Sequence, residues 1–376
     1  MKWEKVKLGN VTDSCLGKKL DQNKNKGDYQ PYLANVNVRW GEFDLKDLPL
    51  MKFEESEQER YELKYGDLVI CEGGEPGRCA IWKEQIPNMK IQKALHRVRV
   101  HDCLDYRYLF YWFLLAGKTG ELDQYFTGAT IKHMPGQKLK EVVIDKPPLE
   151  IQHRIADILS AYDDLIENNQ KQIKLLKEAA QRLYKEWFVD LHFPGHENTK
   201  IVDGVPEGWR RGLLKELISV NYGKDHKKVP DDGNIPVYGS GGLMRKCNKS
   251  LFSGEAVLIP RKGSLNNIMY VDETFWTVDT MFYATMKQPH TAVFVYFFVK
   301  AFDMYSMNIG AAVPSMTTKI LDAMDVVIPD KETLEKFDKY AKVYFNKIKT
   351  LQGQNEQLKT ARDLLLPKLM SGEVEV

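Results

Sequence analysis

The sequence predicts a mixed α/β (α+β) protein with two tandem globular modules. The modules are separated by two long helices that form an antiparallel coiled coil, and the halves are related by an internal pseudo-twofold repeat. In 148–187 and 334–369, apolar residues recur every three or four positions, a spacing typical of a coiled-coil seam. Each of these stretches follows a region of short β-type runs.

The two predicted helices repeat one another at a constant offset, which takes Ile151 to Phe337 and Asn169 to Asn355. Each helix exposes an apolar stripe, so the economical arrangement pairs the two, and the asparagines then fix the register. The alternative is that both stripes pack on other protein. The predicted seam consists of Ile151, Ile155, Ile158, Tyr162, Leu165, Asn169, Ile173 and Leu176 in the first helix, and Phe337, Ala341, Tyr344, Ile348, Leu351, Asn355 and Leu358 in the second.

The repeat extends into the modules, where short motifs recur at offsets that drift. The segments near the ends of each half match, whereas those in the middle differ in length and in nearly every residue. We therefore expect the two modules to share a backbone structure but to present different surfaces. The matched segments are Trp3 with Trp209, Gly17-Lys18 with Gly223-Lys224, Gly66–Ile70 with Gly254–Ile259, Gly128–Thr130 with Gly310–Ala312, and Val142–Ile144 with Val326–Ile328.

These patterns divide the chain into a first module at 1–146, a central helix at 147–190, a connector at 191–207, a second module at 208–328 and a distal helix at 329–370. Pro147-Pro148 starts the central helix, because proline is tolerated in a first turn. Asp330 is the expected N-cap of the distal helix. Expected strands include Asp67–Cys71, Cys79–Trp82, Arg97–His101, Ala256–Pro260 and Ile268–Val271, with module helices at Asp105–Leu115 and Thr291–Phe302.

Composition limits the class of protein. A chain of 376 residues with 43% hydrophobic and 28% charged residues is long enough for two folded cores. It has no apolar run of membrane-spanning length, and its start does not resemble a signal peptide. Five cysteines without a CxxC pair favour the reducing cytoplasm and predict no zinc or other metal site. A net charge of +2 means that any nucleic-acid face must be local.

The sequence shows no catalytic constellation. It lacks the GxxxxGK[ST] phosphate loop, and the glycine-rich stretches at 73–77 and 239–242 are interpreted as turns. We therefore predict a non-catalytic protein. An unrecognised nuclease site using Glu141, Asp145 or Asp330 is an alternative, and it predicts metal-dependent turnover by the isolated chain.

Basic and amide side chains cluster in predicted loops of both modules. Lysine and arginine suit phosphates, while arginine and asparagine can also pair with base edges. Arg245 and Arg261 are the strongest candidates for base reading. The candidate DNA-binding set is Lys18, Lys19, Asn35, Asn37, Arg39, Arg78, Lys132, His133 and Lys138 in the first module, and Lys224, Lys227, Lys228, Ser240, Arg245, Lys246, Arg261, Lys262 and Lys319 in the second.

The string from Val142 to Gln152, a final strand followed by Pro147-Pro148 and a long seam helix, resembles the specificity (S) subunit of type I restriction–modification systems. Gly66–Ile70, Gly128–Lys132 and Pro31–Leu33 also resemble its target recognition domains. The resemblance covers essentially the whole chain in the order domain, helix, domain, helix. The second half departs from the pattern, because Pro329–Leu334 replaces the double proline and no glutamine follows.

The resemblance implies a subunit without activity of its own that recognises double-stranded DNA. Each target recognition domain would read one half of a bipartite, non-palindromic target. The helices would set the gap and dock two adenine methyltransferase subunits. No cofactor is expected in this chain; S-adenosylmethionine, ATP and Mg would belong to the methyltransferase and to the restriction and motor subunits. A two-module adaptor that binds protein ligands is the alternative from another functional class.

Overall fold

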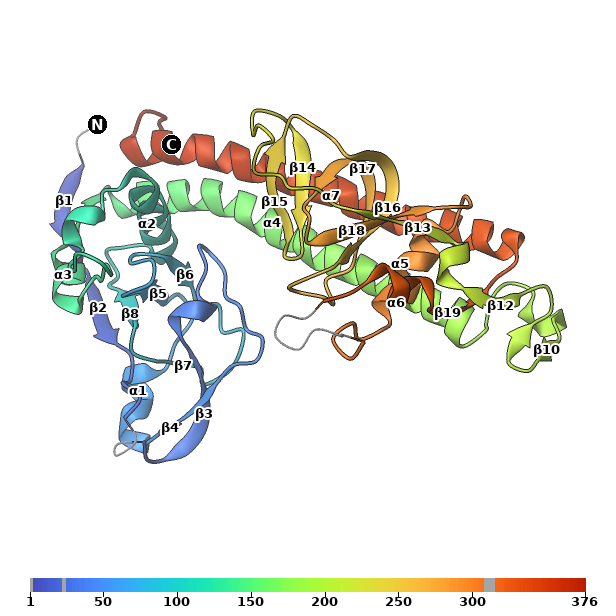
Figure 1. Cartoon of the computed structure of the whole chain (residues 1–376). Coiled ribbons are helices and arrows are strands. Elements are labelled where there is room, and N and C mark those ends of the chain that lie inside the picture. Colours follow the sequence, from blue (N-terminus) through green and yellow to red (C-terminus); the bar gives the residue numbers. More distant parts are fainter. Residues whose placement is uncertain (1–2, 22–24, 308–314) are drawn as a thin grey trace. The chain divides into compact units, whose positions relative to one another are not determined.

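A computed structural model describes residues 3–21, 25–307 and 315–376 (Figure 1). The chain divides into two compact units. Unit 1 comprises Met1–Asn168 and Gln354–Val376, and unit 2 comprises Asn169–Gly353. Each unit therefore combines a β-rich module with half of each long helix. The match between Gly128–Thr130 and Gly310–Ala312 lies outside the described residues.

In unit 1, a four-stranded sheet has the order β2 (Thr12–Leu16), β8 (Leu95–Val100), β5 (Leu68–Cys71), β6 (Cys79–Ile81). One face packs against α2 (Tyr106–Thr119), and the other covers a second core around Trp82. Because it is buried on both faces, β5 is a continuous apolar run. A three-stranded sheet follows the order β4 (Leu50–Phe53), β3 (Asp28–Leu33), β7 (Lys90–Ile91). Short helices α1 (Gln58–Tyr61) and α3 (Gly136–Glu141) complete this module.

In unit 2, a six-stranded sheet has the order β13 (Ile218–Tyr222), β18 (Met281–Met286), β16 (Phe252–Pro260), β17 (Met269–Thr277), β14 (Ile235–Gly239), β15 (Gly242–Cys247). The aromatic helix α5 (Ala292–Lys300) packs on one face of this sheet, and α6 (Thr318–Asp322) follows. The positions predicted for β5, α2, β16 and α5 are confirmed to within a few residues.

The internal repeat is present in the strand pairing. Strand β1 (Glu4–Lys7) pairs with β9 (Val143–Lys146), and β12 (Arg210–Leu213) pairs in the same way with β19 (Asp325–Ile328). In the main sheets, Ser14 lies opposite Val98, and Val220 lies opposite Ala284. The matches predicted near the start of each half are therefore equivalent in backbone structure. The match predicted at the end of each half is wrong by two residues, because the Leu8 amide donates to the Val142 carbonyl whereas the equivalent Leu214 amide donates to the Met324 carbonyl.

The match predicted in the middle of each half is wrong by one residue. Leu68 pairs with Val98, whereas its structural equivalent Val257, not Ala256, pairs with Ala284. A shift of one residue exchanges the two faces of a strand. The sequence match aligned two glycines, but Gly66 lies in the turn before β5, while Gly254 lies inside the longer strand β16.

The long helices are α4 (Leu149–Tyr184), which continues into a π-helical turn at Lys185–Val189, and α7 (Lys331–Ser371). In unit 1, Ile155 and Leu159 of α4 share a core with Leu366 and Met370 of α7. Asp163 forms an ion pair with Arg362, so the two helices run antiparallel there. This pairing was predicted from the apolar spacing.

The same helices also pair in unit 2. The rings of Tyr184 and Trp187 in and just beyond α4 lie 6.3 and 5.9 Å from the ring of Phe337 in α7. Ala341 joins the same core. In each unit, the helix pair therefore packs against the module through aromatic and aliphatic side chains.

The predicted seam is wrong at two positions of α4. Ile158 and Leu165 are 37% and 52% exposed, and their neighbours Leu159 and Ile166 are buried instead. Each error falls in an adjacent apolar pair, in which periodicity selected the wrong member. Of the other seam residues, Ile155, Asn169, Phe337, Ala341, Ile348, Leu351 and Asn355 are buried, and Ile151, Tyr162, Ile173, Leu176, Tyr344 and Leu358 are partly buried. The hydrogen bond between the two asparagines stays a prediction.

The connector differs from its expected irregular form, because β10 (Ile201–Val202) and β11 (Val205–Pro206) form a small hairpin. Over the described ranges, no helix is both long enough and apolar enough to cross a membrane. Within the same ranges, no group of three or more His, Cys, Asp or Glu side chains is placed to hold a metal ion.

Candidate nucleic-acid interface

Several candidate residues gather around one hairpin loop in each unit. We call residues 72–78, between β5 and β6, loop A, and residues 261–267, between β16 and β17, loop B. The Glu72 amide donates to the Ala94 carbonyl at 2.8 Å, and the Arg261 amide donates to the Thr280 carbonyl at 2.8 Å. Loops A and B therefore leave their strands with equivalent hydrogen bonds.

A second chain segment pins each loop in the same way. The amide of Met134 donates to the Glu72 carbonyl at 2.8 Å, and that of Met316 donates to the Arg261 carbonyl at 2.9 Å. Isolated β-bridges join Gly73 to His133 and Lys262 to Ser315. The pinning segments thus bring His133 to loop A and Ser315 to loop B.

Both loops require a glycine at their third position. Gly74 and Gly263 have φ angles of +79° and +84°, which favour glycine over other residues. Candidate side chains also approach these backbones closely. A Cβ atom on Gly74 would lie 3.0 Å from the Asn35 amide, and one on Gly263 would lie 2.7 Å from the Ser240 hydroxyl. Asn35 and Ser240 are therefore at the loops, as part of their support.

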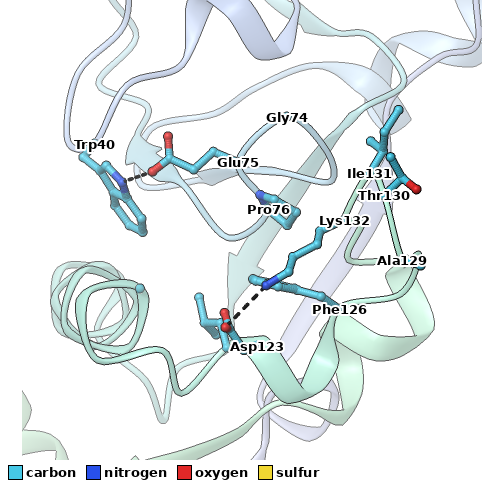
Figure 2. A pocket seen from close by; sticks show the side chains of 12 residues that line it. Trp40, Gly74, Glu75, Pro76, Asp123, Phe126, Ala129, Thr130, Ile131 and Lys132 are labelled. Atoms are coloured by element: carbon cyan, nitrogen blue, oxygen red, sulfur yellow. Dashed lines mark hydrogen bonds and ion pairs between the residues drawn. The ribbon is translucent and has the colours of Figure 1, made fainter.

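A cavity of about 610 Å³ opens beside loop A (Figure 2). Trp40 and Glu75 lie on one side of it, and the Trp40 Nε1 group donates to the Glu75 carboxylate at 2.7 Å. Across the cavity, Lys132 lies 3.5 Å from Asp123 and 5.7 Å from the centre of the Phe126 ring. The cavity therefore combines aromatic rings with two carboxylates and one ammonium group.

Loop B is surrounded by cationic and hydroxyl groups. The Arg261 guanidinium stacks over the Tyr222 ring at 5.7 Å and donates to the Asp279 carbonyl at 3.1 Å. The Tyr222 side chain is 55% exposed, and the next residue of the loop, Lys262, is also exposed. The Tyr305 hydroxyl donates to the Gly263 carbonyl at 3.1 Å, which adds a third support for the loop.

The assignment of Lys18 to a DNA-contacting surface is wrong. Its side chain is buried, donates to the Lys52 carbonyl at 2.9 Å and forms an ion pair with Glu57. Its repeat partner Lys224 has the equivalent backbone position but is exposed. A buried ammonium group that is already paired cannot neutralise a DNA phosphate.

Asn37 and Arg78 also have internal roles, contrary to their prediction as surface contacts. The Asn37 side chain accepts from the Ala34 amide at 2.9 Å and donates to the Asp44 carbonyl at 3.0 Å, closing a turn. The Arg78 guanidinium donates to Glu75 at 2.9 Å and to the Asn35 carbonyl at 3.0 Å, with a largely buried side chain. These contacts hold the segments that flank loop A.

Arg245, one of the two residues favoured for base reading, ties a loop to strand β15. Its guanidinium donates to the carbonyls of His226 at 2.5 Å, Val229 at 2.9 Å and Lys246 at 3.2 Å. An arginine committed to three backbone carbonyls supports the fold. The prediction that it reads a base is therefore withdrawn, while Arg261 remains a candidate.

The other candidates lie on exposed or partly exposed positions of several elements. The Lys138 ammonium pairs with Glu141 at 2.8 Å and lowers the pKa of that carboxyl. Lys132, His133 and Lys262 belong to or face the two loops. The remaining candidates are Lys19 after β2, Arg39 before Trp40, Lys224, Lys227 and Lys228 in the segment after β13, Lys246 on β15 and Lys319 on α6.

Sequence reasoning missed Trp40, Glu75 and Asp123, because it looked for basic and amide side chains. The available signal was Gly73-Gly74-Glu75-Pro76-Gly77, which was interpreted only as a turn. Its structural equivalence to Lys262–Asn266 depends on the corrected strand register.

Residues 1–178 and 206–360 match the family model described as the type I restriction modification DNA specificity domain. The chain belongs to this family. It is similar to the type I restriction enzyme MjaIX specificity subunit of Methanocaldococcus jannaschii, with 27% identity over 352 residues that cover 83% of this chain and 78% of that one. The MjaVIII specificity subunit of the same organism is 24% identical over 412 residues, covering 100% and 93%.

The fold is also similar to a crystal structure of the type I restriction–modification S subunit from M. genitalium. The TM-score is 0.59 at 19% sequence identity, with 98% of this chain and 96% of that one covered. The match with the family model in two segments agrees with the two structural repeats. The chain is accordingly a DNA specificity subunit of a type I restriction–modification system, a non-catalytic role.

Proposed function

We propose that this specificity subunit reads a bipartite, non-palindromic DNA target, with unit 1 reading one half-site and unit 2 the other. The observation that carries the proposal is the pair of loops A and B. They share a backbone and its supports, but their side chains are unlike. Equivalent elements with different side chains suit two different half-sites, since base edges are distinguished by their donors and acceptors.

The proposed domain limits follow the strand pairing. Target recognition domain 1 comprises residues 1–146 and is closed by the ladder between β1 and β9. Target recognition domain 2 comprises residues 208–328 and is closed by the ladder between β12 and β19. The central helix at 147–190, the connector at 191–207 and the distal helix at 329–370 complete the division.

The long helices are proposed to set the gap between half-sites and to dock two adenine methyltransferase subunits. Exposed apolar side chains along both helices support this role, because exposed apolar residues that form a contiguous patch mark a contact surface. Ile158 and Leu165 on α4 belong to this class, and Tyr340, Val343 and Leu364 on α7 are 56%, 64% and 66% exposed. The methyltransferases would bring S-adenosylmethionine, and restriction and motor subunits would bring ATP and Mg, in the cytoplasm.

The proposed DNA-contacting residues are the exposed candidates around the two loops and on neighbouring segments. Lysine contacts to phosphate would dominate the affinity and make it fall steeply as salt concentration rises. The set is Lys19, Arg39, Lys132, His133 and Lys138 in unit 1, and Lys224, Lys227, Lys228, Lys246, Arg261, Lys262 and Lys319 in unit 2, with Asn35 and Ser240 as loop supports.

The experiment that tests this proposal is the Arg261→Ala variant, co-expressed with the cognate methyltransferase in a host without adenine methylation. Sequencing of methylated DNA should show that one position of one half-site is relaxed. The loss of discrimination should be about 1–3 kcal/mol at that position, the usual value of a base-edge pair.

Arg245→Ala is the matched control, because it removes an arginine from the same unit whose guanidinium is committed to backbone carbonyls. It should lower the stability of unit 2 and leave the recognised sequence unchanged. If Arg261→Ala weakened methylation at every sequence equally, Arg261 would not read a base. If the wild-type chain directed no methylation and bound no DNA at low salt, the protein-binding adaptor would replace the proposed function.

A further inference from the structure

We propose that Glu75 in loop A reads a base that presents an exocyclic amino group in the major groove, cytosine or adenine, while loop B reads a base that presents acceptors there. This inference rests on the proposed function and specifies the chemistry of each half-site. It assigns a specificity-determining role to an acidic residue on a DNA-binding module.

The Glu75 carboxylate is held in place by two hydrogen bonds and can still accept others. Trp40 Nε1 donates to one oxygen at 2.7 Å, and the Arg78 guanidinium donates to the other at 2.9 Å. A carboxylate offers about four lone-pair sites, so these two bonds fix its orientation and leave acceptor capacity. The side chain is 54% exposed, which allows a ligand to approach.

The supports of Glu75 are themselves anchored. Trp40 packs so closely on α2 that a Cβ atom on Gly117 would lie 2.6 Å from its ring. The second nitrogen of the Arg78 guanidinium donates to the Asn35 carbonyl at 3.0 Å. The carboxylate is therefore presented from a rigid frame, the condition for reading a base by hydrogen-bond geometry.

Charge decides which ligand the carboxylate would accept. DNA phosphates repel a carboxylate, so Glu75 beside DNA is favourable only where a hydrogen-bond donor faces it. In the major groove, the donors are cytosine N4 and adenine N6, and glutamate and aspartate pair with cytosine N4. Lys132, across the cavity in Figure 2, supplies the positive charge that suits the adjoining phosphates.

The equivalent loop in unit 2 carries the opposite chemistry. The corrected register places Arg261 at the position of Glu72, Lys262 at that of Gly73 and Ser264 at that of Glu75. Arginine and lysine donate to guanine N7 and O6. On the same backbone, loop A thus presents acceptors and loop B presents donors, so the two half-sites should differ in the bases they place there.

The test uses the full chain co-expressed with its cognate methyltransferase, and sequencing of methylated DNA as the readout. Glu75→Gln should relax or change one position of one half-site and leave every other position of the motif unchanged. The preference there should fall by about tenfold or more, since a good base contact supplies about 1–3 kcal/mol. Lys262→Ala should relax a guanine of the other half-site.

Three further variants keep the result interpretable. Trp40→Phe keeps the ring but removes one donor from Glu75, so it should weaken the same position by a smaller factor. Glu55→Gln changes an exposed carboxylate of unit 1, and Lys215→Ala changes an exposed lysine of unit 2. Both should leave the motif unchanged. If the relaxed base pair is G·C, Glu75 reads cytosine, and if it is A·T, Glu75 reads adenine.

The inference is overturned if Glu75→Gln lowers the melting temperature while the motif stays the same, which would make Glu75 a structural residue. It is also overturned if all positions of the motif weaken together. A wild-type chain that directs no bipartite methylation would instead contradict the proposed function itself.

Discussion

Residues at equivalent positions of the two units have different environments. His96 on β8 and Phe282 on β18 lie opposite Ile70 and Ile259, at matching places in the two sheets. His96 is 1% exposed, and its Nε2 group donates to the Met134 carbonyl at 2.9 Å. Met134 belongs to the segment that pins loop A, so this histidine links the sheet core to the candidate interface.

The histidine predicts a pH dependence that unit 2 lacks at the equivalent position. Burial lowers the pKa of His96 below its ordinary value of 6.5, although the hydrogen bond to Met134 acts in the opposite direction. The unfolded chain therefore binds the proton first as the pH falls below about 6.5, and the folded state loses stability. Above about pH 6.5, His96 is neutral in both the folded and the unfolded chain, and its contribution to the free energy of unfolding is fully present.

His96→Phe, which copies the residue of the other unit, should remove this dependence. Hydrogen exchange of the 95–100 segment, measured between pH 5 and 8 and corrected for intrinsic exchange rates, should show protection falling below about pH 6.5 in the wild type and a flatter profile in the variant. Identical profiles would mean that His96 does not control the local stability.

Sequence reasoning at this scale could identify residue types but not their partners. Lys18 and Lys224 occur in the same Gly-Lys motif, yet Lys18 is buried and pairs with the partly buried Glu57, whereas Lys224 is exposed. Arg245 resembled Arg261 until its guanidinium was placed among backbone carbonyls. Such roles depend on contacts between distant segments, which local pattern does not specify.

Among the elements, α7 begins at a well-defined cap. The Asp330 carboxylate accepts from the Thr333 amide at 2.9 Å and from its hydroxyl at 2.6 Å, and Trp209 Nε1 donates to it at 2.9 Å. The N-cap predicted from the sequence is thereby confirmed. The departure from the double-proline pattern does not leave the helix without a start, because Asp330 satisfies the first amides.

Asp330→Ala should destabilise unit 2 by about 0.5–2 kcal/mol, the usual cost of removing an N-cap. Burial acts to raise the pKa of Asp330, but the hydrogen bonds from Thr333 and Trp209 outweigh it and hold the pKa below 3.8. This contribution is present above about pH 4 and is lost as the pH falls through the lowered pKa.

Denaturant unfolding at pH 7 and pH 3, followed by Trp fluorescence, checks this prediction. The stability difference between wild type and Asp330→Ala should shrink at the lower pH. Thr350→Ala, in an exposed middle turn of α7, is the control and should show no such convergence. An equal difference at both pH values would contradict the cap's electrostatic contribution.

The element scale is where sequence reasoning worked best. A three-four apolar spacing identifies a helix seam regardless of partners, so α4 and α7 were predicted nearly to their ends. The failures at Ile158 and Leu165 arose where two adjacent apolar residues competed for one seam position. The shifted match of β5 to β16 arose because a glycine was aligned without knowing whether it lay in a turn or a strand.

For the whole molecule, continuous helices that contribute to both units are proposed to act as a ruler. Inserting seven residues into α4 after Asn168 and seven into α7 before Gln354 should lengthen each helix by about 10 Å. A heptad preserves the seam. The gap in the recognised DNA should increase by about three base pairs, at about 3.4 Å per base pair, while both half-sites stay unchanged.

Methylome sequencing of cells expressing the lengthened chain with its methyltransferase reads the gap directly. Insertion of seven residues into only one helix is the control, and it should reduce assembly because the paired seam goes out of register. An unaltered gap in the doubly lengthened protein would show that the helices do not set the spacing.

The ladders that close the modules have a consequence for how new specificities arise. In unit 1, the chain begins the module on β1 and finishes it on β9, which are hydrogen-bonded neighbours, and β12 and β19 have the same relation in unit 2. The polypeptide between the two strands therefore enters and leaves the module at the same strand ladder. Genetic exchange at the two strands of that ladder would replace the module, and with it the bases that are recognised. The long helices and their proposed docking surfaces would be inherited unchanged.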